Sequence, residues 1–478
     1  MSVTRLARPL RNCLPNSRMP RPVCVRKCGP RLKVPNARQS GDATAPPPSP
    51  LTLEELDALF APLLRLKSVL LAVSGGADSL SLMFLCHHWQ QARAVPLSLH
   101  VASVDHGLRA EATAECAFVA DEAAALGLSH FTLVWTPPLD LSNLQAKARV
   151  ARYQLLADQA RRLGCSHIIL AHHLDDQAET LIMRLLRGSG VTGLGAMRPE
   201  QKLDELTLLR PFLSVPKTRL RASLEAMDKR WVDDPSNHQD AYQRVRVRQW
   251  MPMLAAEGCD AERLAATARR MQRADAALEA MSEQSFHSDV EVKPGRSLRL
   301  SLDGLSSHLE EVRLRIWRRC IDYVAGAAYP PREEKLLALD LAYVRCNSER
   351  DGKRTFGGCC FEPDGHDLWI YRELGRDPFT RSFRAGDPID WPGLYKTVSV
   401  SGMPPHAEGA LKPLGRHGVC LMEQEGQFLA SFRAYHGDLP MGLIEALPSV
   451  WFMDKPVFVK DWTDLSELSG IRVEFQEK

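Results

Sequence analysis

The chain has 478 residues, of which 45% are hydrophobic and 25% carry charge, and these fractions are typical of globular proteins. Its length allows two to four domains, each with a buried core. No stretch approaches the roughly 20 consecutive apolar residues that a membrane-spanning helix requires, so the composition argues against a membrane protein.

The net charge of +3 conceals an asymmetry between the first fifty residues and the rest. Residues 1–50 contain ten Arg or Lys and one acid, Asp42. Without them, the totals of 61 basic and 58 acidic residues fall to 51 and 57, which is a net charge of −6. Residues 51–478 therefore do not form a generally basic surface for nucleic acid, and any RNA contact is expected from local basic patches.

Residues 1–50 are rich in Arg, Pro and Ser and have no hydrophobic periodicity, so we expect a disordered extension. Organelle transit peptides are also Arg-rich and acid-poor, but the many prolines favour a non-essential extension or a later start at Met19. The twelve cysteines form no C-x-x-C pair, which favours reduced, mostly buried thiols and a cytoplasmic location.

From residue 51 onward, strands and helices alternate. A predicted helix at 51–66 precedes four units, each a short apolar strand followed by a helix. The strands are at 69–73, 97–104, 130–135 and 167–171, and the helices are at 78–90, 111–126, 145–163 and 175–187. This pattern predicts an α/β fold with a parallel sheet covered by helices on both faces. Ligands of such sheets bind beyond the carboxyl ends of the strands.

Beyond residue 210 the alternation stops. Helices are predicted at 215–230, 244–285, 307–328 and 331–345, with short strand signals at 353–372 and a Gly- and Pro-rich remainder from 380. We expect four parts, namely a disordered extension at 1–50, an ATP-binding catalytic domain at 51–250, a mainly helical domain at 251–375 and a small mixed or β-rich domain at 376–478.

The stretch Ser74-Gly75-Gly76-Ala77-Asp78-Ser79 lies between a predicted strand and a predicted helix. The glycines allow close approach of the backbone, the serines add hydroxyl donors, and the helix offers free N–H groups to an anion. Asp78 would repel a phosphate unless a divalent cation lay between them, which predicts Mg²⁺ bound with a polyphosphate. A plain strand–helix turn is the alternative, but the full pattern in this context favours a nucleotide site.

A second polar cluster, LAHHLDDQAETLIMRLLRGSGVTGL at 170–194, follows the last predicted strand. Asp175 begins the helix, and Asp176 and Glu179 share one of its faces because they are three residues apart. Two such carboxylates suit binding of an ammonium group, positioning of Mg²⁺ or proton abstraction, whereas favourable contact with the helix dipole explains only one acid. His172 and His173 with Asp175 make a weak metal site because a fourth ligand is missing.

The segment Gly188–Gly193 matches the pattern G-x-G-x-x-G, but it follows a helix rather than a strand. The dinucleotide-binding interpretation therefore fails its context test. We expect a flexible loop that grips the substrate.

The six-residue loop resembles the PP-loop of the ATP pyrophosphatase superfamily, and residues 69–250 resemble tRNA(Ile)-lysidine synthases. The motifs that carry the resemblance are SGGADS, VDHGLR (104–109), NLQAKARVARYQLL (143–156), AHHLDDQAET (171–180), RLLRGSGVTGLGAM (184–197), LLRPFL (208–213), WVDDPSN (231–237) and RVRVR (244–248). Beyond residue 260 the resemblance is weak, since the W-D-G-R-F-like signal common in the family's last domain has only fragments such as KPLGR (412–416) and WFMD (451–454) here.

The resemblance implies an adenine nucleotide alpha hydrolase-like fold and a ligase that uses ATP and Mg²⁺. The family adenylates the C2 carbonyl oxygen of the wobble cytidine in tRNA(Ile) with a CAU anticodon. The ε-amine of L-lysine then displaces AMP and forms lysidine. Because an ammonium group must lose a proton before it attacks, a flanking carboxylate supplies both the binding charge and the base.

The resemblance also implies the roles of individual residues. The catalytic residues are Asp78, Asp176, Glu179 and Arg244. The ATP site comprises Ser74, Gly75, Gly76, Ala77, Asp78, Ser79, Asp105 and His106, with Mg²⁺ at Asp78. The substrate site comprises His172, Asp175, Asp176, Glu179, Arg187 and Arg248. The expected partners are the tRNA and L-lysine, with no membrane, and a homodimer is left open.

Three alternatives are weighed against this ligase. A 2-thiocytidine-type sulfur transferase needs paired active-site cysteines, whereas Cys86, Cys116 and Cys165 lie within predicted helices or at a strand start. A non-catalytic RNA-binding relative has no need of the three acids named as catalytic. An amidotransferase needs a glutaminase nucleophile motif, which we do not find.

Several arginines have two interpretations, as tracks for tRNA phosphates or as ordinary exposed helix faces. They are Arg263, Arg269, Arg270 and Arg273 in one group and Arg313, Arg315, Arg318 and Arg319 in the other. For Arg246, which lies between the two functional arginines of RVRVR, the exposed face is favoured.

Overall fold

The computed structural model describes most of the chain from Pro48 onward. The described residues are 48–107, 111–137, 144–232, 243–326, 331–345, 352–375, 379–384, 389–391, 395–401, 407–426, 430, 432, 436, 438–452, 455–459 and 472–477. The predicted disordered extension at 1–50 lies almost wholly outside them. So do Leu108 and Arg109 of VDHGLR and all of WVDDPSN after Val232.

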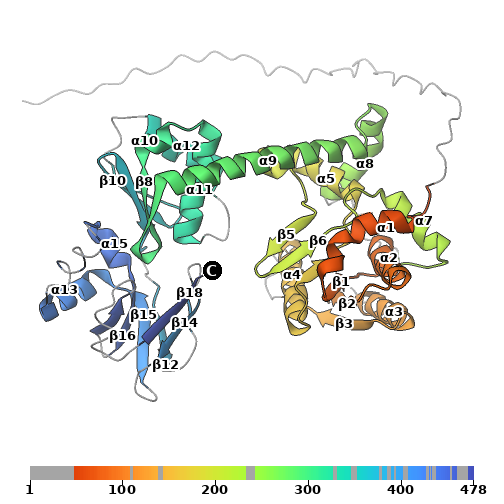
Figure 1. Ribbon diagram of the computed structural model, residues 1–478, viewed down its shortest axis with the longest axis horizontal. Coiled ribbons are helices and arrows are strands. Elements are labelled where there is room, and N and C mark those ends of the chain that lie inside the picture. Colours follow the sequence, from red (N-terminus) through yellow and green to blue (C-terminus); the bar gives the residue numbers. More distant parts are fainter. Residues whose placement is uncertain are drawn as a thin grey trace, which may run out of the picture. The chain divides into compact units, whose positions relative to one another are not determined.

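A six-stranded sheet forms the centre of the first large part of the chain (Figure 1). Its strands are β1 (Ser68–Ala72), β2 (Ser98–Asp105), β3 (Ser129–Val134), β4 (His167–Ile169), β5 (Glu200–Leu203) and β6 (Leu206–Leu209). The order is β3-β2-β1-β4-β6-β5, and all neighbours are parallel except β5 and β6. The predicted parallel sheet is confirmed, and the antiparallel β5–β6 hairpin at its edge was not predicted because each strand has four residues.

Helices cover both faces of this sheet. The helical segments of this part of the chain are α1 (Leu53–Phe60), the 3₁₀ turn η1 (Ala61–Arg65), α2 (Ala77–Arg93), α3 (Glu111–Ala125), α4 (Leu144–Arg162), α5 (Leu174–Leu185), α6 (Val191–Leu194) and α7 (Lys217–Ala226). Side chains alternate along β1, so that Val69 and Leu71 join a core with α1, α2, α3 and α7, whereas Leu70 joins a core with α4. This two-residue period is that of a buried strand.

The strand order reverses between β1 and β4. From β1 the chain proceeds to β2 and then β3 on one side, and α4 carries it back to β4 on the other side. In an open α/β sheet this reversal leaves a crevice beyond the carboxyl ends of the two central strands, where ligands bind. The segments that follow β1 and β4 are those that hold SGGADS and HHLDD.

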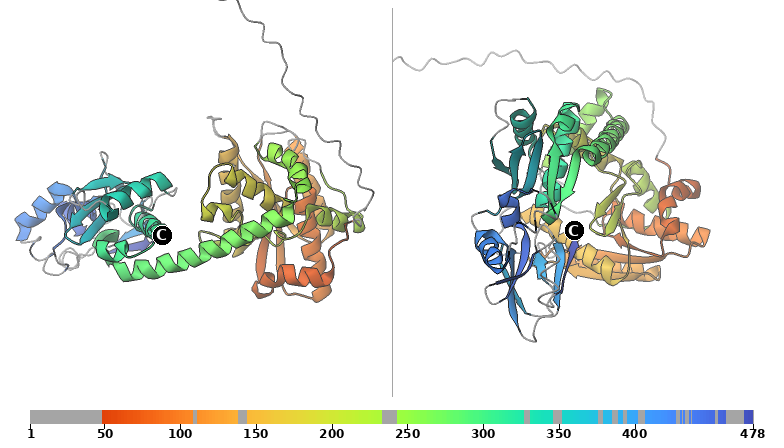
Figure 2. Two further views of the ribbon diagram at one scale, coloured as in Figure 1. Left: turned by 90° about the horizontal axis from the view of Figure 1, so that it is seen from above. Right: turned by 60° about the vertical axis from the view of Figure 1, so that its left-hand side comes forward.

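The predicted helix at 244–285 is wrong as a single element. The structure has α8 (Gln243–Ala256) and α9 (Ala261–Asp289) instead. Gly258 has a φ of +81°, which favours glycine, and Asp260 caps α9 by accepting from the Arg263 N–H at 2.8 Å. Helix α9, the long green helix in Figure 2, has 29 residues and contacts α5 and α6 as well as α11 (Glu310–Ala325).

The region after α9 contains more strand than the sequence predicted. A five-stranded antiparallel sheet has the order β7-β8-β11-β10-β9. Its strands are β7 (Val290–Lys293), β8 (Ser297–Ser301), β9 (Arg354–Phe356), β10 (Cys359–Asp364) and β11 (Asp367–Arg372), and its helical segments are η3 (Pro294–Arg296), α10 (Leu302–Ser306), α11, α12 (Glu333–Asp340) and the π-helical turn η4 (Leu341–Arg345). The expected mainly helical part thus contains a sheet.

The last part holds two small antiparallel sheets, of the orders β12-β15-β16-β17 and β13-β14-β18. The strands are β12 (Arg381–Arg384), β13 (Ile389–Trp391), β14 (Tyr395–Ser401), β15 (Glu408–Pro413), β16 (Pro448–Phe452), β17 (Lys455–Val459) and β18 (Arg472–Glu477), and the helices include α13 (Gly415–Gly426) and α15 (Met441–Ala446). Within the described residues, no helix is long and apolar enough to cross a bilayer.

Candidate active site

The SGGADS loop joins β1 to α2 and has the shape of an anion cradle. Gly75 has a φ of +86°, a conformation that side-chain-bearing residues rarely adopt. Gly76 is the N-cap of α2 and provides no side-chain cap, so the first N–H groups of the helix stay available to an anion. The Ser79 hydroxyl donates to the Gly76 carbonyl at 3.0 Å and accepts from the Ser74 N–H at 3.1 Å. Ser79 therefore shapes the loop from within, rather than offering a free donor.

His173 connects the two central strand ends. It is only 2% exposed and is the N-cap of α5, where its Nδ1 accepts from the Asp176 N–H at 3.3 Å. Its Nε2 lies 3.4 Å from Asp78 Oδ2 and 3.5 Å from Asp176 Oδ2. The predicted ATP-site carboxylate and the predicted substrate-site carboxylate thus meet at one buried imidazole.

The charges of this cluster are coupled. Burial raises the pKa of Asp78, but the hydrogen bond and charge of His173 and the charge of Lys217 outweigh it and lower the pKa to about 2. Burial alone would lower the pKa of His173, but the hydrogen bond to Asp78 and the surrounding carboxylates raise it above its ordinary value. Burial also opposes ionisation of Asp176, whose pKa is nevertheless lowered by the charges of His173 and Arg244. Both carboxylates are therefore anionic at neutral pH.

His172, the neighbour of His173, behaves in the opposite way. Burial lowers its pKa to about 3, and the charge of Asp176 opposes this effect only in part. Its Nδ1 is buried and has no hydrogen-bond partner among the described residues. His172 is therefore neutral at physiological pH and offers a ring nitrogen to a ligand.

Asp175 and Lys217 join α5 to α7. The Asp175 carboxylate accepts from the backbone N–H of Lys217 at 2.9 Å, and the Lys217 ammonium lies 3.1 Å from Asp78 Oδ2. Lys217 was not predicted as a site residue. The sequence does hold a signal for it, because a turn separates the apolar run LTLL from Lys217, as in the other strand–turn–helix units. That run was not predicted as a strand of the same sheet.

Glu179 is held by two arginines of α8. Its carboxylate is 3% exposed and accepts from Arg248 Nε at 2.7 Å and Arg248 Nη2 at 3.2 Å, while Arg244 Nε lies 3.1 Å away. Arg244 also donates to the Thr180 hydroxyl at 3.1 Å. The two arginines are one helical turn apart, and Arg246 is exposed beside the buried Val247. The structure thus brings Glu179, Arg244 and Arg248 together and leaves Arg246 outside the group.

The remaining predicted site residues lie in local contacts. Both oxygens of Asp105 accept bonds from its own neighbourhood, from the Gly107 N–H at 2.9 Å and the Thr113 hydroxyl at 2.8 Å. These bonds lower the pKa of Asp105. His106 stacks edge-on against Trp135, with ring centres 6.1 Å apart. Arg187 is exposed and donates to Gln243 at 2.8 Å. Roles for these three residues stay predictions.

The Gly188–Gly193 segment leads into the short helix α6, which contacts α9. The Thr192 hydroxyl donates to Asp275 at 2.6 Å, and Gln272 donates to the carbonyls of Gly195 and Met197 at 2.6 and 2.8 Å. Gln177 of α5 exchanges two bonds with the Met197 backbone. The segment after α5 is therefore fastened to α9 and to α5 itself.

The two groups of arginines differ. Arg263, Arg269, Arg270 and Arg273 are exposed on α9, so contact with RNA remains a prediction for them. On α11, Arg313 forms an ion pair with Asp340 at 2.7 Å and Arg315 forms one with Asp275 at 2.9 Å. Arg318 and Arg319 both bind Glu279. These four arginines neutralise carboxylates within the protein.

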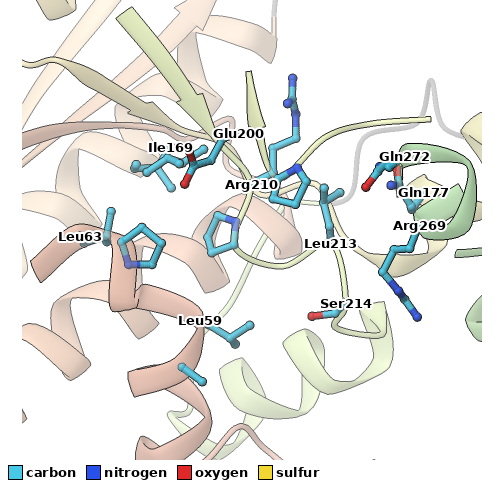
Figure 3. Close-up of a pocket in the computed structure, with 15 residues that line it drawn as sticks. Leu59, Leu63, Ile169, Gln177, Glu200, Arg210, Leu213, Ser214, Arg269 and Gln272 are labelled. Carbon is cyan, nitrogen blue, oxygen red and sulfur yellow. The ribbon is translucent and has the colours of Figure 1, made fainter. Parts of the chain in front are cut away.

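A cavity of 260 Å³ lies near the edge of the sheet (Figure 3). Leu59, Leu63 and Ile169 are on one side of it, and Arg269 and Gln272 are on the other. It contains none of the residues Ser74–Ser79, so it is separate from the loop described above. Within the described part of the chain, no three His, Cys, Asp or Glu side chains are grouped as metal ligands.

A glycine-rich loop after β1 and carboxylates after β4, meeting at the reversal of a parallel sheet, are the arrangement of an ATP-binding domain of the PP-loop class. A family model described as a PP-loop domain matches residues 50–254. The solved structure of a U34-tRNA thiolase, NcsA, from Methanococcus maripaludis matches with a TM-score of 0.40 and 17% identity, covering 46% of this chain and 78% of that one. At these values the likeness carries no argument about the substrate.

Curated relatives narrow the class to a family. The tRNA(Ile)-lysidine synthase of Rhodopseudomonas palustris is 44% identical over 66% of this chain and 93% of its own length. Those of a Bradyrhizobium species and Ruegeria pomeroyi are 42% and 37% identical, over 58% and 80% of this chain and 79% and 85% of their own lengths. The chain belongs to the tRNA(Ile)-lysidine synthase family and is an enzyme.

Proposed function

We propose that this enzyme ligates L-lysine to C2 of the wobble cytidine in tRNA(Ile) with a CAU anticodon. ATP adenylates the C2 carbonyl oxygen and releases pyrophosphate, and the ε-amine of lysine then displaces AMP to give lysidine. The observation that carries this proposal is the meeting of Asp78 and Asp176 at His173, 3.4 and 3.5 Å from one nitrogen. A nucleotide site and an amine site then share one edge of the sheet.

Mg²⁺ is part of the proposal, and the residues fit it. Asp78 Oδ1 is buried and has no hydrogen-bond partner among the described residues, and an unpaired buried carboxylate oxygen is costly unless a ligand satisfies it. Mg²⁺ prefers one or two carboxylates together with phosphate oxygens. Asp78 would hold the ion, which would neutralise charge on the phosphates.

Asp176 is the residue proposed to bind the lysine ammonium and take its proton. Its side chain is 14% exposed and lies one turn before Glu179 on α5. Burial opposes its ionisation, but the charges of His173 and Arg244 lower its pKa, so Asp176 is anionic at neutral pH and can bind an ammonium group. Glu179 differs, since both of its oxygens already bind arginines. We therefore assign Glu179 the task of holding Arg244 and Arg248 where adenylation develops negative charge.

The sulfur-transferase alternative is not favoured. Burial raises the pKa of Cys86 to about 12 and that of Cys116 to about 11. These thiols therefore stay protonated at neutral pH, and the thiolate is the form that attacks or binds sulfur. All the cysteines among the described residues are unpaired thiols.

The direct test is incubation of the purified enzyme with ATP, labelled L-lysine and tRNA carrying a CAU anticodon. We expect lysine to become covalently attached to this tRNA, with a tRNA of different anticodon as the control. ATP binding without lysine incorporation would overturn the proposal. In the variant Asp176→Asn we expect transfer to fall roughly 10²–10⁴-fold, with ATP affinity nearly unchanged. Equal loss of both would assign Asp176 to the nucleotide site. A homodimer and a cytoplasmic location stay predictions.

A further inference from the structure

Lys217 lies beside the Ser74–Ser79 loop, which itself contains no lysine. Lys217 is the first residue of α7, and its Nζ lies 3.1 Å from Asp78 Oδ2. The side chains of Lys217 and Asp78 are 29% and 28% exposed. The ammonium therefore lies at the mouth of the crevice, next to the loop rather than within the core.

The position of Lys217 is fixed by contacts on both sides. Its backbone N–H donates to Asp175 at 2.9 Å, and the Leu174 N–H donates to the Val215 carbonyl at 3.0 Å, so the starts of α5 and α7 are joined. Helix α7 is in turn fastened under the loop, because the buried Ser81 hydroxyl of α2 donates to the Leu220 carbonyl at 3.0 Å. The base of the side chain is rigidly placed, while its four-carbon stem stays free to turn.

The partner that Lys217 has in this structure does not by itself explain its placement. A partly exposed ion pair of this kind typically contributes about 1 kcal/mol or less to stability. Asp78 Oδ2 already faces His173 Nε2 at 3.4 Å, so a second cation on the same oxygen is not needed for neutralisation. A divalent ion bound to Asp78 would repel the Lys217 ammonium group. The nearest other anion for this group would then be a phosphate held by the loop.

We propose that Lys217 is the phosphate-binding lysine of this site, held on Asp78 until Mg²⁺ and ATP bind and then transferred to the β- and γ-phosphate oxygens. This inference rests on the proposed function. In adenylation the cytidine O2 forms a bond to the α-phosphorus, and the bond from that phosphorus to the α,β-bridging oxygen breaks. The bridging oxygen leaves with the electron pair as part of pyrophosphate. Lys217 keeps its proton and stabilises the added charge on the leaving group.

The test compares nucleotides with and without the β- and γ-phosphates. For the full chain with Mg²⁺, we expect Lys217→Met to weaken ATP binding by about 10–100-fold, which corresponds to one hydrogen bond to a charged group. AMP affinity should stay within about twofold of wild type, because AMP lacks the phosphates that Lys217 contacts. Lys217→Arg should recover part of the ATP affinity. Calorimetry measures both dissociation constants, and the melting temperature without nucleotide reports the fold.

Lys229 provides a matched control. It follows the C-terminal end of α7, its Nζ lies 3.0 Å from Glu122 Oε2, and its side chain is 31% exposed. Lys229→Met should therefore leave both affinities unchanged. Equal weakening of ATP and AMP by Lys217→Met, or an unchanged ATP affinity, would overturn the inference. Wild-type enzyme that binds ATP but does not attach lysine to tRNA would instead contradict the proposed function, so the two failures are distinct.

Discussion

Two helices of this enzyme carry closely spaced arginines, and the structure uses them differently. On α8, Arg244 and Arg248 bind Glu179, which is 3% exposed, while the arginines themselves are 38% and 39% exposed. On α11, Arg315 binds Asp275, which is 2% exposed, but Arg315 itself is only 4% exposed. A buried carboxylate thus anchors each group. Arg244 and Arg248 thus keep far more exposed surface than Arg315, and a substrate anion can bind there.

An arginine-rich motif alone does not indicate whether its guanidinium groups are free to bind a ligand. In the sequence, RVRVR and RLRIWRR both read as basic helix faces. The acids that occupy the second group, Asp275, Glu279 and Asp340, come from α9 and α12, far away in the chain. A guanidinium group can bind a ligand only if it is not buried in an ion pair within the protein. Because the acids that form such ion pairs come from distant segments, the local sequence does not distinguish a binding face from an internal ion-pair network.

We expect the largest loss of stability from a substitution that breaks the ion-pair network of α11. Arg315→Met leaves Asp275 buried without one of its cations, and we expect a loss of about 3–5 kcal/mol in the free energy of unfolding. Arg318→Met removes an ion pair of a side chain that is 27% exposed, and should cost no more than about 1 kcal/mol. Denaturant titration measures both. Equal costs would mean that burial does not separate the two arginines.

The next effect concerns the α8 group. Glu179→Gln removes the charge that holds Arg244 and Arg248, and we expect adenylation to slow about 10–100-fold, less than the 10²–10³-fold loss from removing a stabilising donor itself. Stability should fall less than in Arg315→Met, since water reaches the half-exposed arginines. A pyrophosphate-release assay measures the rate. A variant that loses stability as Arg315→Met does, but keeps its rate, would make Glu179 a purely structural residue.

A smaller loss of stability is expected from a substitution in α9, which lies between α8 and α11 in the sequence. Gln272 precedes Asp275 by one turn and binds the carbonyls of Gly195 and Met197. Gln272→Ala should reduce the unfolding free energy by about 1–2 kcal/mol because two hydrogen bonds are lost. Thr267→Ala, which removes one exposed bond on the same helix, should stay within about 0.5 kcal/mol. A larger loss of unfolding free energy in Thr267→Ala than in Gln272→Ala would contradict the importance of the Gln272 hydrogen bonds.

The sequence predicted the parts of the fold whose signals are local. The apolar strands, the Gly75 turn and the acids at the start of α5 are each contained in a few adjacent residues, and the order of the units predicts that they share a sheet edge. Lys217 and the Gln177–Met197–Gln272 contacts were missed because their meaning depends on which segments pack together. The β5–β6 hairpin was missed because Glu200–Leu203 carries no clear alternation. A strand of four residues contains only two repeats of a period of two, so its signal is weak.

The Gly188–Gly193 segment shows the same limit from the other side. Its glycines suggested a flexible loop that grips the substrate, and they do allow a tight path, since Gly188 has a φ of +68°. The structure turns this path into α6 and binds it to Asp275 through Thr192. Composition predicted the turn, but the acid that holds it is over eighty residues later in the chain. Substrate contact by this segment stays a prediction.

The smallest effect is a difference in titration between two adjacent histidines, His172 and His173. Burial lowers the pKa of His172 to about 3, whereas hydrogen bonding to Asp78 and nearby carboxylates raise the pKa of His173 above its ordinary value of 6.5. In a titration followed by NMR, His173 should lose its proton above pH 6.5. His172 should show no change between pH 5 and 8. The variants His172→Asn and His173→Asn assign the two signals.

The same shifts fix the sign of the pH dependence. The unfolded chain protonates His172 below about pH 6.5 and the folded chain does not, so this residue reduces stability as the pH falls from about 6.5 toward 3. The stabilisation from His173 is complete below about pH 6.5 and fades as the pH rises through its raised pKa. If both histidines titrated together near pH 6.5, the cluster that joins Asp78 to Asp176 would not be the closed, charged arrangement on which the proposed nucleotide and amine sites depend.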